Sequence, residues 1–147
     1  MASTGDFMTD SITSRIGVFE SVMGAVIGKC TYGLLVVSDR DSADAHDDWN
    51  PATEVVHAGP DSLYVGVRDA AGGAVLVIVA DRAEISSEAF LLHEGSFTSP
   101  SLSIHVYDPG ESFSLVIPID EAEFSVKVYG DNLRESSEIV VLLGGSV

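Results

Sequence analysis

The densest group of side chains that could do chemistry is a run of five aspartates in residues 39–48, followed directly by a tryptophan. Oxygen-rich loops bind Ca²⁺, but the EF-hand pattern fails because Ala43 stands at the third ligand position and Asp44 replaces the turn glycine. An exposed Trp beside carboxylates has the composition of an interface anchor. We interpret the run as an acidic contact loop, with a solvated loop between strands as the alternative. Its candidate contact residues are Asp39, Asp41, Asp44, Asp47, Asp48 and Trp49.

A second acidic group, Asp120, Glu121 and Glu123, follows a predicted strand. Solvent in a turn region keeps such carboxyls ordinary acids, so they are not an acid–base pair. We add these three residues to the candidate contact surface.

Catalytic and metal-binding patterns are missing from the sequence. No two histidines stand at a spacing of two or four residues, as a metal pair would; they are His46, His57, His93 and His105. No serine lies in a Gly-x-Ser-x-Gly turn, and the apolar neighbours of Cys30 predict a buried, inert thiol. We therefore expect no catalytic residue, no metal, no cofactor and no enzymatic activity.

Charge is the outlying property of the composition. The 23 acidic residues stand against 7 Lys and Arg, which gives a formal net charge of −16. Nucleic acids and anionic membranes are both bound through Lys and Arg, so direct binding to either is disfavoured. A basic protein partner is favoured, unless the charge serves solubility alone.

The length of 147 residues suits one domain. We expect a flexible N-terminal segment over residues 1–14 and a single domain over residues 15–147. Residues 1–14 contain no apolar run of the kind a secretory signal has, and Cys30 has no second cysteine to pair with. These features predict a cytoplasmic protein.

Short runs with apolar residues at every second position predict strands. Residues 62–69 alternate cleanly, and residues 74–80 are apolar on both faces, as in a central strand; Gly72-Gly73 between them predicts a two-residue hairpin turn. Four later runs predict a meander, at residues 102–107, 113–117, 124–128 and 139–143. Further strands are expected over residues 15–20, 32–39 and 88–97; a helix over residues 18–27 is an alternative that its glycines disfavour.

Eight or nine short strands with almost no helical periodicity predict an all-β fold, an antiparallel β-sandwich, with a closed barrel as the alternative. The order of segments resembles the competence protein J family of nuclease inhibitors. The resemblance covers about residues 49–143: a Trp after an acidic loop, Gly59-Pro60 before residues 62–69, Ser96-Phe97 closing residues 88–97, and the later strand runs.

The resemblance implies a small acidic protein that binds and silences a nuclease, and it assigns no functional residues. The electrostatics agree, because a nuclease cleft shaped for phosphate is basic. We therefore expect an inhibitor or immunity-type protein for a basic nuclease or toxin. One alternative is a structural module that forms a homodimer or larger homo-oligomer, with Tyr64, Tyr107 and Tyr129 on its contact faces. Another is a sandwich that binds carbohydrate or depends on Ca²⁺.

Overall fold

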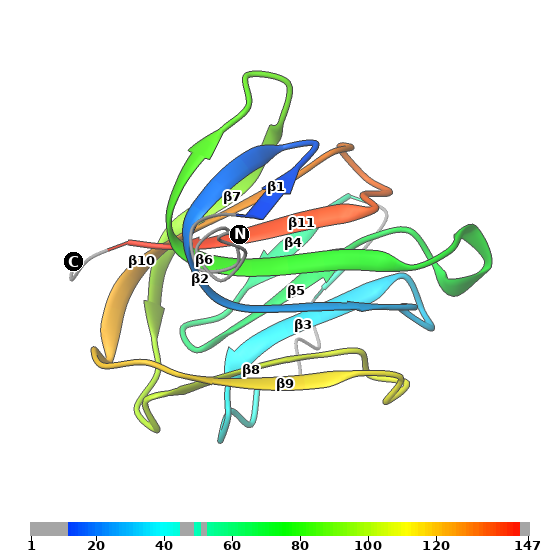
Figure 1. Ribbon diagram of the computed structural model, residues 1–147. Helices are drawn as coiled ribbons and strands as arrows, with labels where there is room; N and C mark the ends of the chain where they lie inside the picture. The colour runs from blue at the N-terminus through cyan, green and yellow to red at the C-terminus, as the bar shows by residue number, and fades with distance from the viewer. Residues whose placement is uncertain (1–11, 45–48, 51–52, 145–147) are drawn as a thin grey trace, which may run out of the picture.

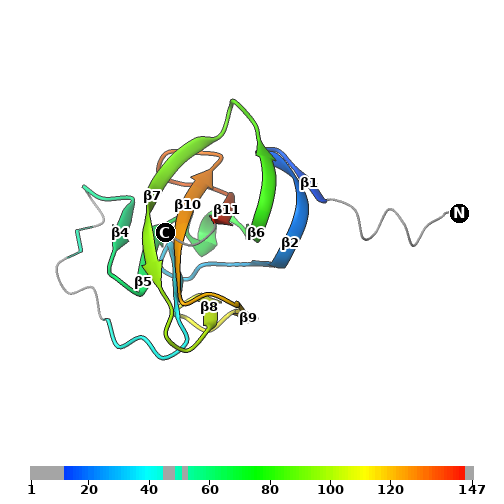
Figure 2. The same cartoon turned by 90° about the vertical axis from the view of Figure 1, so that its left-hand side faces the viewer.

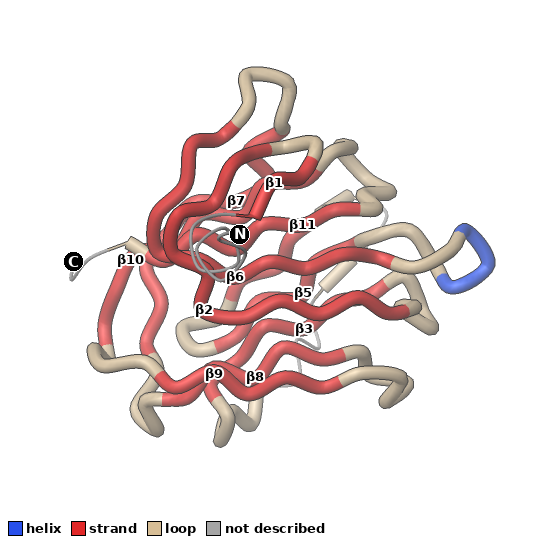
Figure 3. Tube along the Cα trace, viewed as in Figure 1, coloured by secondary structure: helices blue, strands red, loops and turns tan. Residues whose placement is uncertain are grey.

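The computed structural model describes residues 12–44, 49–50 and 53–144, which form two packed β-sheets (Figure 1). Strands dominate, and one 3₁₀ turn, η1 (Ala70–Gly72), is the helical element of the described chain (Figure 3). No described helix is long and apolar enough to cross a membrane. The strands are β1 (Ile12–Ser14), β2 (Gly17–Gly28), β3 (Leu34–Asp39), β4 (Val56–Ala58), β5 (Ser62–Gly66), β6 (Val75–Ile85), β7 (Phe90–Thr98), β8 (Ser103–Tyr107), β9 (Ser114–Pro118), β10 (Glu123–Gly130) and β11 (Glu138–Leu143).

The predicted all-β sandwich is confirmed. One sheet has six strands in the order β1-β2-β6-β11-β10-β7, and the other has five in the order β4-β5-β3-β8-β9. The described residues thus form eleven strands, more than the eight or nine expected, because short β1 and β4 carry little sequence signal. The pairs are antiparallel except β6 with β11, which run parallel at the centre of the six-stranded sheet.

The main core lies between the two sheets and follows the alternation seen in the sequence. Leu63 and Val65 of β5 point inward, as do Ile104 and Val106 of β8, and all four are fully or almost fully buried. Phe97 stacks on Phe124 in this core, with ring centroids 5.3 Å apart. Burial of such side chains stabilises each by about 1.5–3 kcal/mol.

A second cluster covers the outer face of the six-stranded sheet. Ile78 and Val140 point outward from β6 and β11, and they pack against Phe19 of β2. Register shifts in β2 beyond Phe19 accompany a bend of the strand, and the β1–β2 hairpin stays paired with β6 at the edge of the curved sheet (Figure 2). Arg15 joins this hairpin to β11 through Glu138, with Nε 2.8 Å from Oε2. The expectation that residues 74–80 form a strand covered on both faces is confirmed.

Two sequence expectations about connections are wrong. Gly72-Gly73 does not turn a hairpin, because β5 and β6 belong to different sheets; Asp69 caps η1, and the chain crosses over there. The meander is two separate hairpins, β8–β9 and β10–β11, one in each sheet. Residues 18–27 lie in strand β2, so the helix that their glycines disfavoured does not form; strand β1 lies just ahead of Arg15.

Two glycines of β2 allow the sheets to approach each other closely where β2 passes β9. A Cβ on Gly28 would lie 2.6 Å from Cδ2 of Phe113, and one on Gly24 would lie 2.9 Å from Cδ1 of Ile117. Any side chain at these positions would displace the β9 side of the core. The glycines that disfavoured a helix therefore have a packing role in the strand.

Candidate functional site

Four connections meet at one end of the sandwich: the start of the β3–β4 connection, the β4–β5 turn, the β7–β8 turn and the β9–β10 connection. Backbone hydrogen bonds hold them together: Asp39 N to Asp61 O at 2.8 Å, Thr98 N to Pro60 O at 2.9 Å, Ser99 N to Ala122 O at 2.7 Å and Ile119 N to Leu102 O at 3.0 Å. Seven carboxylates lie on these connections and on nearby β6 and β10. We call them the acidic end: Asp41, Asp44, Asp61, Asp81, Asp120, Glu121 and Glu123.

Asp39 was predicted as a contact residue, and the structure corrects this. Its side chain is buried, at 2% exposure, and its Oδ1 accepts hydrogen bonds from the hydroxyls of Ser99 at 2.5 Å and Ser101 at 2.6 Å. Burial alone would raise the pKa of Asp39, but the hydrogen bonds from Ser101 and Ser99 outweigh it and lower the pKa. Asp39 therefore fixes the β7–β8 turn against β3 and offers nothing to a partner.

The rest of the predicted loop divides into three parts. Asp41 and Asp44 are exposed at the acidic end, where Oδ2 of Asp44 accepts a hydrogen bond from Ser62 Oγ at 3.1 Å. Asp47 and Asp48 lie outside the described residues. Trp49 lies apart from the acidic end.

Trp49 is half-buried against the outer face of β5. Its ring meets that of Tyr64 edge-on with centroids 5.6 Å apart, and its Nε1 donates to Glu54 O at 3.1 Å. It lines a hollow of about 370 Å³ together with Tyr32 and Arg134, near the opposite end of the sheet. Trp49 and the Asp120 group therefore cannot act in a single small contact.

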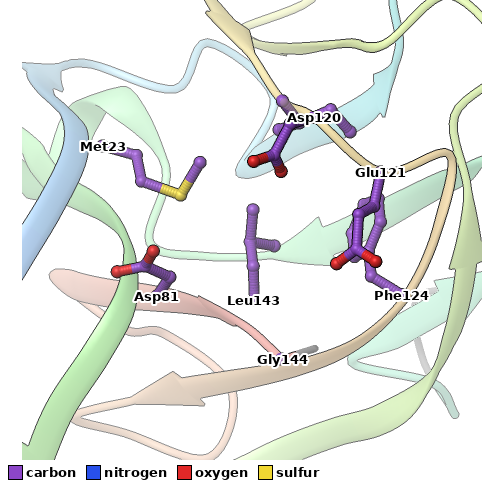
Figure 4. Close-up of a pocket in the computed structure, with 8 residues that line it drawn as sticks. Met23, Asp81, Asp120, Glu121, Phe124, Leu143 and Gly144 are labelled. Carbon is purple, nitrogen blue, oxygen red and sulfur yellow. The ribbon is translucent and has the colours of Figure 1, made fainter. Parts of the chain in front are cut away.

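Asp120 and Glu121 line one cleft, and Asp81 of β6 lines it with them. The three line a cleft of about 340 Å³ whose other walls include Met23 and Leu143 (Figure 4). In Figure 4 the three carboxylates lie around Leu143, and Met23 lies at the rim near Asp81. Glu123 is exposed at the start of β10, outside the cleft. The arrangement suits a long cationic side chain, whose methylene groups would contact Met23 and Leu143 while its charge meets the carboxylates.

Sequence reasoning missed two residues of the acidic end. Asp81 ends the doubly apolar run of β6, and Asp61 follows Gly59-Pro60 in the β4–β5 turn. Each is a single acidic residue beside a strand, with no local pattern to distinguish it from a solvated carboxylate. The sheet topology alone brings Asp81 and Asp61 beside residues that are distant from them in sequence.

Metal and nucleophile sites are not found in the part of the chain that the structure describes. No group of three or more His, Cys, Asp or Glu residues there could hold a metal ion. Cys30 is fully buried, and burial raises the pKa of its thiol to about 12, with the negative charge of Asp108 adding to the effect. The expected buried thiol is therefore confirmed.

The three tyrosines proposed as contact faces are separated by the fold. Tyr64 and Tyr107 point outward from the five-stranded sheet, on either side of Val36 of β3. Tyr129 belongs to the other sheet and packs against the second cluster beside Val140. Only Tyr64 and Tyr107, of these three tyrosines, lie on one face and could belong to the same contact.

Comparison with known proteins identifies the architecture. No protein-family model and no curated protein sequence matches the chain. The crystal structure of ComJ from Bacillus subtilis, the inhibitor of the DNA-degrading activity of NucA, superposes with a TM-score of 0.64 at 13% sequence identity. The alignment covers 91% of this chain and 100% of ComJ.

The chain has the ComJ fold. At 13% identity this likeness concerns the backbone architecture alone. The resemblance to the competence protein J family expected from the order of segments is thereby confirmed for the fold. The likeness spans both sheets, because nearly the whole chain is aligned.

Proposed function

We propose that this protein is an inhibitor-type protein that binds a basic nuclease or toxin through the acidic end. The observation that carries the proposal is the cleft that Asp81, Asp120 and Glu121 line together with Met23 and Leu143. The fold shared with ComJ, an inhibitor of a DNA-degrading activity, supports it.

The physical basis is charge mimicry of a phosphate chain. A nuclease active site that binds DNA presents Lys and Arg to successive phosphates, and a surface with several carboxylates can occupy the same positions. The net charge of −16 also steers a basic partner toward the protein and raises the association rate at low salt. Inhibition then needs binding alone, with no catalytic step by this chain.

A basic side chain in the cleft would be held through its methylene groups, which would contact Met23 and Leu143, and through its charge. Its charge would pair with carboxylates of Asp120 and Glu121 from the β9–β10 connection and of Asp81 from β6. Because the three come from elements fixed by the sheets and their turns, little conformational entropy would be lost on binding. Two basic residues adjoin the acidic end in the sequence. Arg40 has its Nε 3.7 Å from Oδ1 of Asp41, and Arg82 follows Asp81.

The test begins with capture of the partner. The full chain, immobilised, is mixed with lysate of its source cells at low salt, and bound protein is eluted by a salt step and assayed for DNA degradation with and without added free chain. We expect one basic protein whose degrading activity the chain suppresses. Capture of a partner whose activity is unchanged by the chain would overturn the inhibitor proposal.

A matched pair of triple variants locates the site. Asp81→Asn with Asp120→Asn and Glu121→Gln removes three charges from the cleft. The control, Glu84→Gln with Glu88→Gln and Glu135→Gln, removes three charges from exposed positions outside the acidic end. We expect the cleft variant to lose inhibition by about 100-fold or more, because the three lost charged contacts together need to cost only about 2.7 kcal/mol for this, and the control to change it little. Equal losses would indicate that net charge, and not the cleft, drives binding.

A further inference from the structure

The outer face of β8 and β9 has no charged side chain, although the protein is strongly acidic. Inward residues of these strands, such as Ile104 and Ile117, belong to the core, so the alternate residues point outward. The outward residues are Ser103, His105, Tyr107, Ser114, Val116 and Pro118. We call them the neutral face. The outward residues Val36 and Ser38 of the adjoining strand β3 are uncharged as well, but both are buried, so the open part of the face lies on β8 and β9.

The neutral face is open to solvent along β9. Ser114, Val116 and Pro118 are all exposed, and Val116 exposes 47% of its surface. This differs from the other sheet, whose outer face carries the second buried cluster around Phe19, Ile78 and Val140. An exposed strand face without a carboxylate is unexpected in a chain with 23 acidic residues.

Side chains of the neutral face hold one another in place. The rings of His105 and Tyr107 stack with centroids 4.2 Å apart, and Nε2 of His105 lies 2.7 Å from Oγ of Ser114 in a hydrogen bond. Side chains fixed before binding lose little rotamer entropy on binding. Depletion of charge and enrichment of Tyr are features of the buried centre of protein interfaces. A hollow of about 530 Å³ beside the face is lined by His105, Tyr107 and Phe113 but also by the acidic residues Asp108 and Glu111, so it borders the neutral face without belonging to it.

We propose that the neutral face is the surface through which two copies of this chain pack together. Each copy carries a net charge of −16, so most approaches of one copy to another bring carboxylates together and are repulsive. Contact through the neutral face places no charged side chain of β8 or β9 against its counterpart in the other copy. A basic partner, by contrast, is attracted toward the acidic surfaces and gains no electrostatic attraction here.

The geometry of such a dimer follows from the sheet. Two copies related by a two-fold axis would place the same patch of each against the other, with the β8–β9 faces packed about 10 Å apart, as sheets pack in sandwiches. Tyr107 and Val116 would lie in the buried centre. The acidic end lies beyond the strand ends of this sheet and not on its face, so each copy would keep its cleft free for a basic partner.

The test measures self-association of the full chain by sedimentation equilibrium at low and high salt. We expect a dimer that becomes tighter as salt rises, because salt screens the repulsion between the two acidic copies. This sign is opposite to that of binding to a basic partner, so failure of one proposal is distinguishable from failure of the other. A monomer at all protein concentrations, or a dimer that weakens with salt, would overturn the proposal.

Two matched variants locate the contact. Val116→Glu places a charge in the neutral face, and Val18→Glu makes the same change at a valine of β2 that is 41% exposed. We expect Val116→Glu to weaken the dimer about tenfold or more, since like charges juxtaposed at an interface cost several kcal/mol, and Val18→Glu to leave it unchanged. Circular dichroism and the melting temperature of both variants check that the fold is kept. A dimer that survives Val116→Glu, or that is equally weakened by Val18→Glu, would contradict the assignment.

Discussion

The hydroxyl of Ser99 donates a hydrogen bond of 2.5 Å to Oδ1 of Asp39, joining the β7–β8 turn to the end of β3 across 60 residues of sequence. Both residues are buried. The aspartate that begins the most acidic run of the sequence is therefore part of the fold, and the turn that it holds borders the acidic end.

Replacing Asp39 by Ala should destabilise the protein by about 2–3 kcal/mol, because the hydroxyls of Ser99 and Ser101 would lose their charged acceptor in a buried place. Urea denaturation followed by circular dichroism measures the change. Asp41→Ala, at an exposed neighbouring position, is the control and should alter the free energy of unfolding little. A loss no larger than that of the control would show that the buried carboxylate is dispensable.

Acid should remove the stabilisation that Asp108 provides. Burial would raise its pKa, but hydrogen bonds from Ser112, Gly110 and Thr31 lower it, so the folded-state pKa lies below the unfolded one. A lowered folded-state pKa gives stability that is fully present above the unfolded pKa, at about 3.9, and lost as pH falls through the folded-state value. The difference in free energy of unfolding between wild type and Asp108→Asn should therefore be constant from pH 7 to 5 and shrink below about pH 4. A difference that stays constant into acid would contradict this.

Cys30 should be unreactive while the protein is folded. Its side chain is fully buried and the pKa of its thiol is about 12, so at pH 8 almost no thiolate is present or accessible. Labelling with a chromogenic disulfide reagent should proceed only after denaturant is added. Rapid labelling of the native protein would show that the β2–β3 turn opens locally.

A methyl group at Gly28 should destabilise the sandwich by about 1–3 kcal/mol, since the nearest atom of the Phe113 ring would lie only 2.6 Å from the new Cβ. Gly72→Ala is the matched control, because its Cβ would meet the nearest atom, Cδ of Arg68, at 3.4 Å. Thermal unfolding compares the two variants. Equal melting temperatures would mean that β9 yields to the methyl group.

Strand positions were readable from the sequence because each face of a sheet imposes a period of two. Ser62–Gly66 showed one buried face, and Val75 to Ala80 showed two, which correctly placed β5 and β6 in the fold. The connection between them was misread because Gly72-Gly73 fits a tight turn in either topology. Only contacts between residues distant in sequence decide whether two successive strands pair or belong to opposite sheets.

The candidate site was predicted in part. Asp120 and Glu121 do line a cleft, and Asp41 and Asp44 are exposed at the same end. Asp39 was misplaced because a run of aspartates gives no sign of which one turns inward to meet serines 60 residues away. Asp81 was missed because the residues beside it in the cleft, Asp120 and Glu121, are distant from it in sequence. Burial and long-range neighbours, which local sequence does not encode, account for both errors.

The parallel pairing of β6 with β11 has a consequence for the order of folding. β11 also pairs with β10, so it is the strand that links β1-β2-β6 to β10-β7. Until Glu138–Leu143 is inserted, the six-stranded sheet exists as two fragments with unprotected inner edges. Such non-local pairing has high contact order, so assembly should be slow and its late step should be the closing of this gap. A chain cut before β11 would then be incomplete, and a separate peptide with the β11 sequence would be the natural piece to restore it by complementation.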